Sequence, residues 1–409
     1  MEPSPGAAAL PGNSTGARLP GLDLLRAIAI GWVLLFHASV AGLVSPASWI
    51  VGFGWMGVDL FFALSGFLIA GQLFRPWARG VAPDYLRFFA RRLLRTLPAY
   101  LAVVALYFLV PVVRERPDIQ PLWQYLTFTQ NFDLSFPLPK AFSHAWSLCV
   151  EEQFYLVLPA VVALLARRPR LAGVVGVMVA VLLAGMALRG YFWLHGVARE
   201  PSLSATRLNW HGYMTLIYYP TWSRLDGLLA GVAAAATQIF RPRWWRILTA
   251  MPNLLLATGI AGVGVAIGFF HEIYAAFLPT VFGFPLLAAS MAMLVIAGSE
   301  RRSIIGRYPA PGAAALAAGA YSLYLCNKMT FHAVQVLLPY GPSQLQPFSL
   351  VAGLLATLAG GTMLYWLVER PFLKLRDRLR APSSNPYAAQ PFAPASESAS
   401  ASAARASVY

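Results

Sequence analysis

Long apolar segments constrain the fold of this chain more than any other feature. A helix needs about 20 mainly apolar residues to cross a bilayer, and ten segments meet this need. They cover roughly residues 22–44, 52–74, 97–113, 145–166, 171–194, 222–240, 252–270, 276–297, 312–338 and 348–369. The chain is 58% apolar and only 11% charged, whereas a soluble domain has about 45–50% apolar and about 25% charged residues. The sequence therefore predicts an all-α polytopic membrane protein of about ten transmembrane helices.

Basic residues are distributed unevenly between the two sides of these segments. With the N-terminus inside, the inner segments hold 22 Lys and Arg residues and the outer loops hold 7. Cytoplasmic loops carry such an excess, so we expect both termini in the cytoplasm. The net charge of +15 falls between long apolar runs. It therefore indicates membrane topology, and we expect no nucleic-acid partner.

One membrane domain accounts for most of the chain. We expect residues 1–20 to form a disordered N-terminal lead, 21–380 the membrane domain, and 381–409 a disordered tail rich in Ala, Ser and Pro. The first 20 residues lack a basic region directly before a short apolar core, so they do not resemble a cleaved signal peptide. Cys149 and Cys326 lie in apolar stretches without paired spacing. We expect no disulfide, no metal and no bound cofactor.

Ionisable residues inside the apolar segments are candidates for function, because each costs about 2.5–3.5 kcal/mol on insertion scales. The first segment contains Arg26 and His37, eleven residues apart. Eleven helical steps end about 20° past three full turns, so the two side chains share one face, with a rise of about 16 Å between them. We expect Arg26 near the cytoplasmic surface and His37 in the outer half of the membrane.

Carboxylates in two further segments are expected at the depth of His37. Asp59 lies in the second segment and Glu151 in the fourth, where Ser147 shares the face of Glu151 at i and i+4. A carboxylate partner orients a histidine and keeps it basic enough to take a proton from a hydroxyl. We therefore propose His37, Glu151 and Asp59 as catalytic candidates. The same outer layer supplies the candidates for acceptor binding or support, Ser147, Glu152, Arg224 and Asp226.

A basic cluster precedes the third apolar segment on the cytoplasmic side. In the run 87–95, Arg92 and Arg95 are about one helical turn apart, with Arg91 beside them. Guanidinium groups bind phosphate oxygens in bidentate geometry. Acyl-coenzyme A is a cytosolic polyanion that carries an activated acyl group, so we expect it as co-substrate, bound by this cluster and Arg26.

Each of these residues also has a purely structural interpretation. Arg26 can extend to lipid headgroups, and the run 87–95 can act only as a positive-inside anchor. His37 can be a packed interfacial histidine. Asp59, Arg224 and Asp226 can form structural ion pairs, and Glu151 with Glu152 can lie in a loop at headgroup level.

Seven blocks of sequence together resemble a known family. In chain order they are LDLLRAIAIGWVLLFH, GVDLFFALSGFLIAG, FFARRLLRTLPAY, HAWSLCVEEQFYLVLP, SRLDGLLAG, YSLYLCN and LVERP. Their order and content resemble the acyltransferase-3 family of integral membrane O-acyltransferases over residues 20–380. The resemblance implies ten membrane helices in the bacterial inner membrane. It also implies transfer of an acyl group, often acetyl, from cytosolic acyl-CoA to a hydroxyl of a carbohydrate or another acceptor.

Three family motifs are intact in this chain. The Arg-x10-His motif falls on Arg26 and His37, Arg-x-x-Arg on Arg92 and Arg95, and Ser-x-x-x-Glu on Ser147 and Glu151. Some relatives append an extracytoplasmic hydrolase-like domain, and we expect this chain to act without one. The block that ends in Asn327 departs from the family pattern, in which a histidine more often follows the tyrosine pair. The resemblance therefore assigns no role to that helix.

Two other classes of function remain as alternatives to an acyltransferase. In a transporter or channel, the same intramembrane charges would relay protons or a solute. In a receptor-like protein they would hold a ligand, although the short outer loops disfavour this class. The identity of the acceptor stays open at the level of sequence.

Overall fold

The computed structural model describes residues 19–46, 48–134, 140–166, 171–198, 209–272, 276–338 and 346–379. Helices dominate these residues, and no strand occurs among them. The predicted all-α class is therefore confirmed. The expected disordered lead and tail lie almost entirely outside the described residues and stay predictions.

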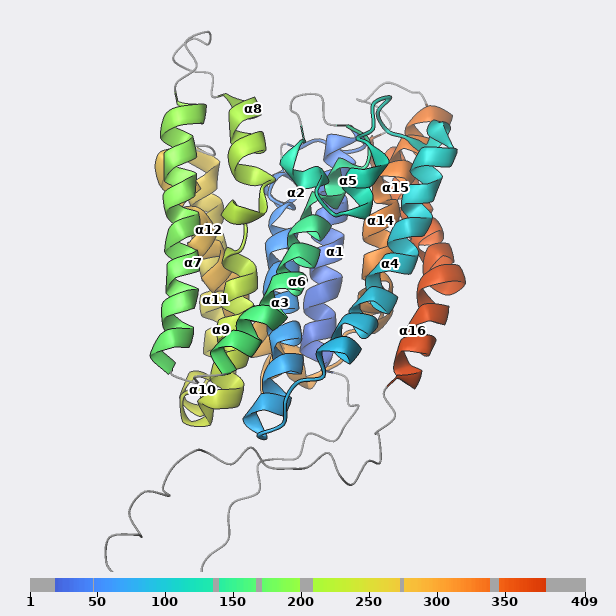
Figure 1. Ribbon diagram of the computed structural model, residues 1–409. Helices are drawn as coiled ribbons and strands as arrows, with labels where there is room; N and C mark the ends of the chain where they lie inside the picture. Colours follow the sequence, from blue (N-terminus) through green and yellow to red (C-terminus); the bar gives the residue numbers. More distant parts are fainter. Residues whose placement is uncertain are drawn as a thin grey trace, which may run out of the picture.

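Long helices run side by side through the height of the molecule (Figure 1). They are α1 (Pro20–Val40), α3 (Met56–Ala78), α4 (Tyr85–Leu109), α6 (Trp146–Ala166), α7 (Leu171–Phe192), α11 (Pro252–Glu272), α12 (Phe284–Ser299), α14 (Ala313–Leu337) and α15 (Gln346–Leu364). Shorter helices are α2 (Trp49–Gly52), α5 (Leu122–Leu126), α8 (Trp210–Tyr213), α9 (Asp226–Phe240), α10 (Pro242–Leu248), α13 (Ile304–Arg307) and α16 (Arg370–Arg378). A wider π-turn, Tyr365–Glu369, joins α15 to α16.

Eight helices in the described part of the chain are long and apolar enough to cross a membrane. The other two expected spans correspond to α9 and α14. Helix α9 has 15 residues, and α14 has 25 but is less apolar because it carries polar side chains such as Asn327 and Lys328. The chain is thus a multi-pass membrane protein, while the number ten and the side of the termini stay predictions.

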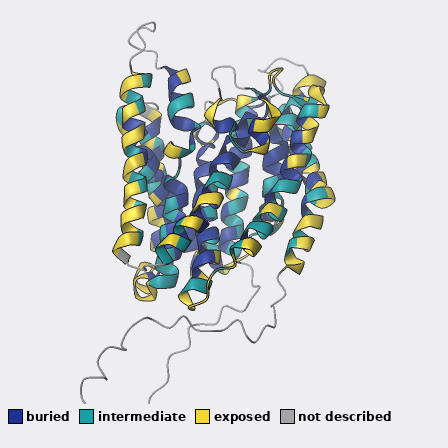
Figure 2. Cartoon of the chain, in the orientation of Figure 1, coloured by how far each residue is buried: buried dark blue, intermediate teal, exposed yellow. Residues whose placement is uncertain are grey.

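Burial divides the helices into inner and outer ones (Figure 2). In α3, 78% of the most apolar window is buried, whereas in α7 only 11% is buried. Exposed apolar side chains such as Val175, Val179 and Leu183 follow α7. Because helices satisfy their own backbone hydrogen bonds, such a surface suits contact with lipid. The charged side chains of the inner helices are therefore held within protein.

Close packing of α3 on α9 positions the polar residues of both helices. Gly66 of α3 lies against the backbone of Leu228, and Gly231 of α9 lies against the backbone of Ala63 and Phe67. Glycine allows two helix backbones to approach where a Cβ atom would collide. This crossing sets the start of α9, with Asp226, close to α3.

Candidate active site

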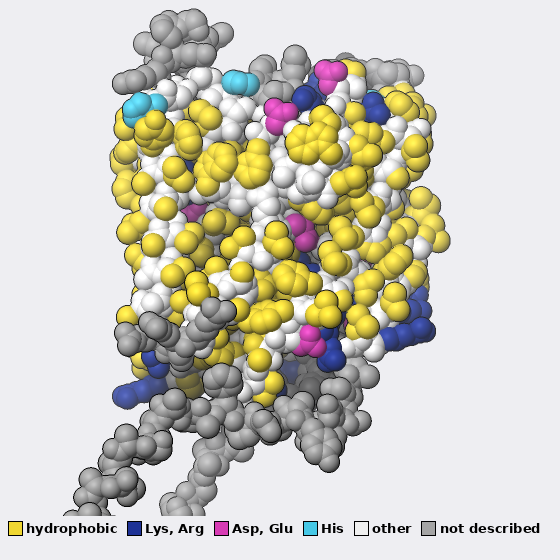
Figure 3. Space-filling view, in the orientation of Figure 1, with side chains coloured by type: hydrophobic (Ala, Val, Ile, Leu, Met, Phe, Trp, Pro, Cys, Tyr) yellow, Lys and Arg dark blue, Asp and Glu magenta, His cyan; other side chains and the backbone are white. Residues whose placement is uncertain are grey.

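A cavity of about 720 Å³ lies among α1, α3, α4, α6, α14 and α16. Its lining reaches from Ala314 to Tyr324 along α14, ten residues that span about 15 Å. One end of the cavity lies at the start of α1 and beside α16. Figure 3 shows Lys and Arg side chains gathered at the lower edge of the molecule, below a wide hydrophobic band. The deep end is lined by Ser147 and Tyr324.

The arginines expected to bind phosphate meet in this cavity. Arg26, Arg91, Arg92 and Arg95 all line it. Arg26 pairs with Asp23, with 3.4 Å between Nη1 and Oδ1. The structure thus unites residues of α1 and α4 that the sequence separates by more than sixty positions.

Two of these arginines are fixed by neighbouring helices. The guanidinium carbon of Arg92 lies 4.0 Å from the ring centre of Tyr155 in α6. Arg95 forms an ion pair with Glu369, with 3.1 Å between Nη1 and Oε1. Such contacts restrict the long side chains and hold their charges at the cavity wall.

Glu151 and Glu152 also line the cavity, which corrects their expected place beside His37. Glu151 accepts hydrogen bonds from Ser65 Oγ at 3.2 Å and from Tyr155 Oη at 2.7 Å. Ser147 shares the cavity, so the predicted common face of Ser147 and Glu151 is confirmed. That face is turned toward α3 and α4, which the spacing within one helix could not reveal.

An asparagine takes the place of the expected carboxylate at His37. The distance from His37 Nδ1 to Asn327 Oδ1 is 2.9 Å, and Asn327 Nδ2 donates to the carbonyl oxygen of Tyr324 at 2.5 Å. Because the amide nitrogen is used in this way, Asn327 presents its oxygen to the ring, and Nδ1 of His37 is the donor. In the described part of the chain, Nε2 makes no hydrogen bond. It keeps its lone pair, which is the form required of a general base.

Tyr324 separates this histidine from the cavity. Its ring centre lies 6.2 Å from that of His37, and its side chain lines the deep end of the cavity. Tyr324 Oη donates to the carbonyl oxygen of His144 at 2.6 Å, so Ser147 Oγ donates to Tyr324 Oη at 2.7 Å. A path through the cavity from the arginines to His37 therefore passes the side chain of Tyr324.

His144 completes the group around His37 and was missed at the level of sequence. Its Nε2 lies 3.0 Å from the carbonyl oxygen of Tyr324, and its ring centre is 5.6 Å from that of His37. Both His144 and Tyr324 fall inside blocks that carried the family resemblance, HAWSLCVEE and YSLYLCN. Their place in these blocks was the one feature of the sequence that could have identified them as site residues.

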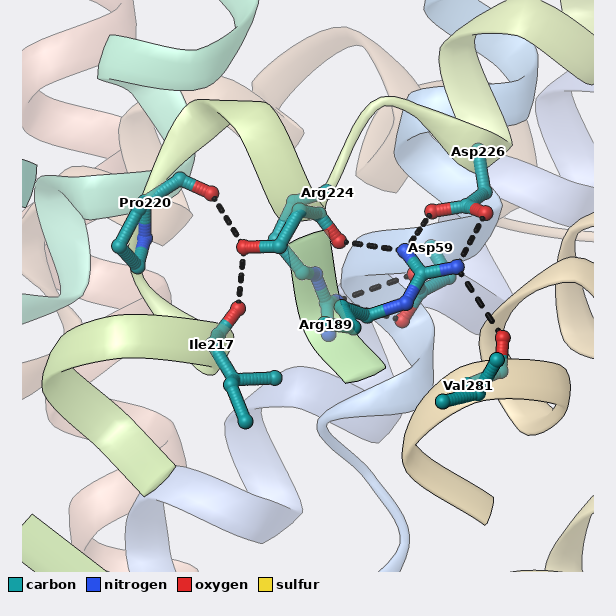
Figure 4. Close-up of polar contacts among 8 residues, drawn as sticks. Asp59, Arg189, Ile217, Pro220, Arg224, Asp226 and Val281 are labelled. Atoms are coloured by element: carbon teal, nitrogen blue, oxygen red, sulfur yellow. Dashed lines mark hydrogen bonds and ion pairs between the residues drawn. The ribbon is translucent and has the colours of Figure 1, made fainter. Parts of the chain in front are cut away.

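Asp59, Arg224 and Asp226 form a separate buried cluster with Arg189, shown in Figure 4. Arg224 Nη2 donates to both carboxylate oxygens of Asp59 at 3.0 Å. Arg189 donates to Asp226 at 2.7 and 3.0 Å, and also to the carbonyl oxygen of Val281 at 3.3 Å. All four charged residues are at most 7% exposed.

This cluster corrects the expected approach of Asp59 to His37. Both oxygens of Asp59 are used by Arg224, whose guanidinium carbon also lies 4.3 Å from the ring centre of Phe284. Arg189 lies within the apolar segment 171–194 and was not singled out at the level of sequence. The closed ion pairs tie α3, α7 and α9 together, as the structural interpretation of these residues predicted.

Lys328 lies in α14 directly after Asn327 and has two partners. Its Nζ donates to Ser143 Oγ at 2.7 Å and lies 3.9 Å from Glu115 Oε1. Glu115 also accepts from the backbone N–H of Phe142 and from Tyr107 Oη, both at 3.0 Å. These contacts join Glu115 and Ser143, which lie between α4 and α6, to the interior of α14.

A buried tyrosine stabilises the same segment. Tyr125 Oη donates to the carbonyl oxygen of Ala141 at 3.0 Å. Burial raises the pKa of the Tyr125 phenol above its ordinary value, so the group stays a protonated donor.

Neither cysteine forms a disulfide in the described residues. Cys149 and Cys326 are free and buried. Among the described residues, no group of three or more His, Cys, Asp or Glu side chains could hold a metal ion.

Comparison with known proteins gives one family match. A family model described as an acyltransferase domain matches residues 19–366. An O-acetyltransferase OatA of Staphylococcus aureus is 29% identical over 230 residues, which are 53% of this chain and 34% of the relative. The peptidoglycan O-acetyltransferase OatA of Listeria monocytogenes is 28% identical over 233 residues, 53% of this chain and 33% of the relative. The chain thus matches about a third of the length of these relatives. No solved structure matches.

Proposed function

Because the chain belongs to the acyltransferase-3 family and is a membrane acyltransferase, we propose that it moves an acetyl group from cytosolic acyl-CoA to a hydroxyl of a cell-wall carbohydrate. One observation carries the proposal. A single cavity begins at a group of arginines and ends at Tyr324, against which His37 packs. A polyanionic donor and a general base are thereby brought to the two ends of one path.

The charges of the cavity support acyl-CoA as the donor. Seven basic side chains line it, against four acidic ones. The basic side chains are Arg26, Arg91, Arg92, Arg95, Arg370, Lys374 and Arg376. Guanidinium groups at a partly buried wall bind phosphate oxygens strongly. A neutral donor would leave this excess of positive charge without a counterpart.

The tautomer of His37 supports its role at the acceptor. With Nδ1 held by Asn327, Nε2 takes the proton of the acceptor hydroxyl. The hydroxyl oxygen attacks the thioester carbonyl carbon, a C–O bond forms, and the C–S bond breaks. The thiolate of coenzyme A leaves and takes up a proton from the imidazolium. Asn327 is a positioning residue in this scheme, since it acts through His37.

Two of the relatives direct the choice of acceptor toward peptidoglycan. The relative from Listeria monocytogenes is named a peptidoglycan O-acetyltransferase, and another, from Bacillus subtilis, is named a putative peptidoglycan O-acetyltransferase. A carbohydrate hydroxyl outside the membrane also agrees with the basic end of the bundle facing the cytoplasm. The donor then enters from the basic end, and the acceptor reaches His37 from the far end.

A transporter is the weaker candidate. Two pairs of buried charges that could relay protons, Asp59 with Arg224 and Arg189 with Asp226, are each joined by two hydrogen bonds, and none of these residues lines the cavity.

Label transfer tests the proposal. Purified protein in lipid nanodiscs receives acetyl-CoA labelled in the acetyl group together with a soluble peptidoglycan fragment. We expect labelled fragment with the wild type and none with His37→Ala. His195→Ala is the control and should stay active, because His195 is an exposed histidine in the π-turn that follows α7. Wild-type activity in a folded His37→Ala variant would refute the role of His37.

A further inference from the structure

The short helix α16 contributes a second basic group to the cavity, distinct from the arginines of α4. Arg370, Lys374 and Arg376 line the same cavity as Arg92 and Arg95. In Figure 1, α16 runs along the lower part of α4, at the basic end of the bundle. No sequence motif had assigned these side chains to a ligand.

An ion pair fixes the start of α16 against the cavity. Glu369 is 1% exposed, pairs with Arg95 at 3.1 Å, and accepts from Ser322 Oγ at 2.6 Å. The guanidinium carbon of the next residue, Arg370, lies 3.8 Å from the ring centre of Trp366. The basic side chains of α16 are therefore carried on a helix whose first turn is anchored.

The charges on α16 are only partly balanced by protein acids. Arg376 pairs with Asp377 at 2.8 Å. Arg370 and Lys374 form no ion pair with any acid among the described residues. Positive charge at a cavity mouth attracts and holds an anion.

Distances along the helices show how far the arginine of α4 lies from Ser147 and how far the basic side chains extend along α16. Arg92 lies over Tyr155, which follows Ser147 by eight residues, or about 12 Å of α6. Arg370 and Arg376 are six residues apart, about 9 Å along α16. A ligand that uses both groups must carry anionic groups at two places, as well as a part that reaches Ser147.

We propose that α16 binds the terminal 3′-phosphate of the coenzyme A donor, while the arginines of α4 bind its diphosphate. The proposal rests on the donor named under the proposed function. Acyl-CoA carries a thioester, a diphosphate and a 3′-phosphate in this order, so it can supply both anionic groups and the part that reaches Ser147. Tyr365 lines the cavity beside α16 and offers an aromatic face to the adenine.

Comparison of two ligands tests this assignment. Coenzyme A and 3′-dephospho-coenzyme A differ in the one phosphate that α16 would bind. We expect Lys374→Ala and Arg376→Ala each to weaken binding of coenzyme A about tenfold, because charge-assisted hydrogen bonds to phosphate are lost. Binding of the dephospho form should stay unchanged. Arg378→Ala serves as the control, since Arg378 is exposed on the same helix and does not line the cavity.

The outcomes separate this inference from the proposed donor. If the α16 variants weaken binding of both ligands equally, or weaken binding of neither, the assignment of the 3′-phosphate to α16 is wrong. Acyl-CoA then remains the proposed donor. Failure of the wild type to bind either ligand refutes the donor itself. Both ligands are measured by calorimetry in nanodiscs of zwitterionic lipid and again with anionic phosphatidylglycerol. If the α16 variants alter only the response to anionic lipid, the helix binds lipid headgroups and the inference is wrong.

Discussion

The buried pair of Arg189 and Asp226 gives a prediction with a magnitude. Asp226→Leu leaves a fully buried guanidinium without its carboxylate, since Arg189 is 0% exposed. Removing one partner of a buried pair costs about 3–5 kcal/mol, whereas replacing both by apolar groups is often close to neutral. Arg189 also donates to Ser223 and Val281, and each carbonyl left unsatisfied costs about 1–3 kcal/mol. With two such carbonyls, the double variant Arg189→Leu with Asp226→Leu should therefore cost about 2–6 kcal/mol, less than the two single changes together.

A double-mutant cycle measures this coupling. Unfolding is followed in detergent micelles by tryptophan fluorescence, and we expect a coupling free energy of at least about 2 kcal/mol. The control is the pair of Arg87 and Asp84, whose side chains are 42% and 55% exposed and where the coupling should lie below about 1 kcal/mol. Additive costs at Arg189 and Asp226, within about 0.5 kcal/mol, would refute the argument that this cluster is a closed ion pair.

Three further changes test other parts of the structure. Asn327→Leu should lower turnover about 100-fold with little effect on donor affinity, because His37 loses the acceptor that fixes its tautomer; normal turnover would contradict this. Arg92→Ala should reduce the rise in melting temperature that coenzyme A gives the wild type, and an unchanged rise would exclude Arg92 from the donor site. Gly231→Ala should destabilise by about 1–3 kcal/mol, because its Cβ would collide with the α3 backbone. Gly264→Ala, where the added Cβ meets nothing within 4 Å, should not destabilise.

Hydropathy predicted the helices well because each span needs its own apolar run. The segment expected at 145–166 is α6 at Trp146–Ala166. The start of the third span was missed, since α4 begins at Tyr85 and includes the basic run 87–95. Asp84 caps this helix by accepting from the backbone N–H of Arg87 at 2.9 Å, a signal that a hydropathy window does not register.

The candidate site shows a different limit. Helical periodicity correctly put Ser147 and Glu151 on one face, because that relation lies within one helix. It could not reveal that this face meets α3 and α4, or that the partner of His37 is Asn327, 290 positions away. Contacts between helices depend on packing angles and rotations, which the spacing along a single helix does not encode.

Transfer across a sealed membrane tests most directly the path from the arginines to His37. Proteoliposomes of known protein orientation receive labelled acetyl-CoA on the side of the basic end, and the carbohydrate acceptor is enclosed on the other side. Label should appear on the enclosed acceptor with the wild type and be absent with His37→Ala. Label that appears only when donor and acceptor share one compartment would contradict entry of the donor and the acceptor from opposite ends of the bundle.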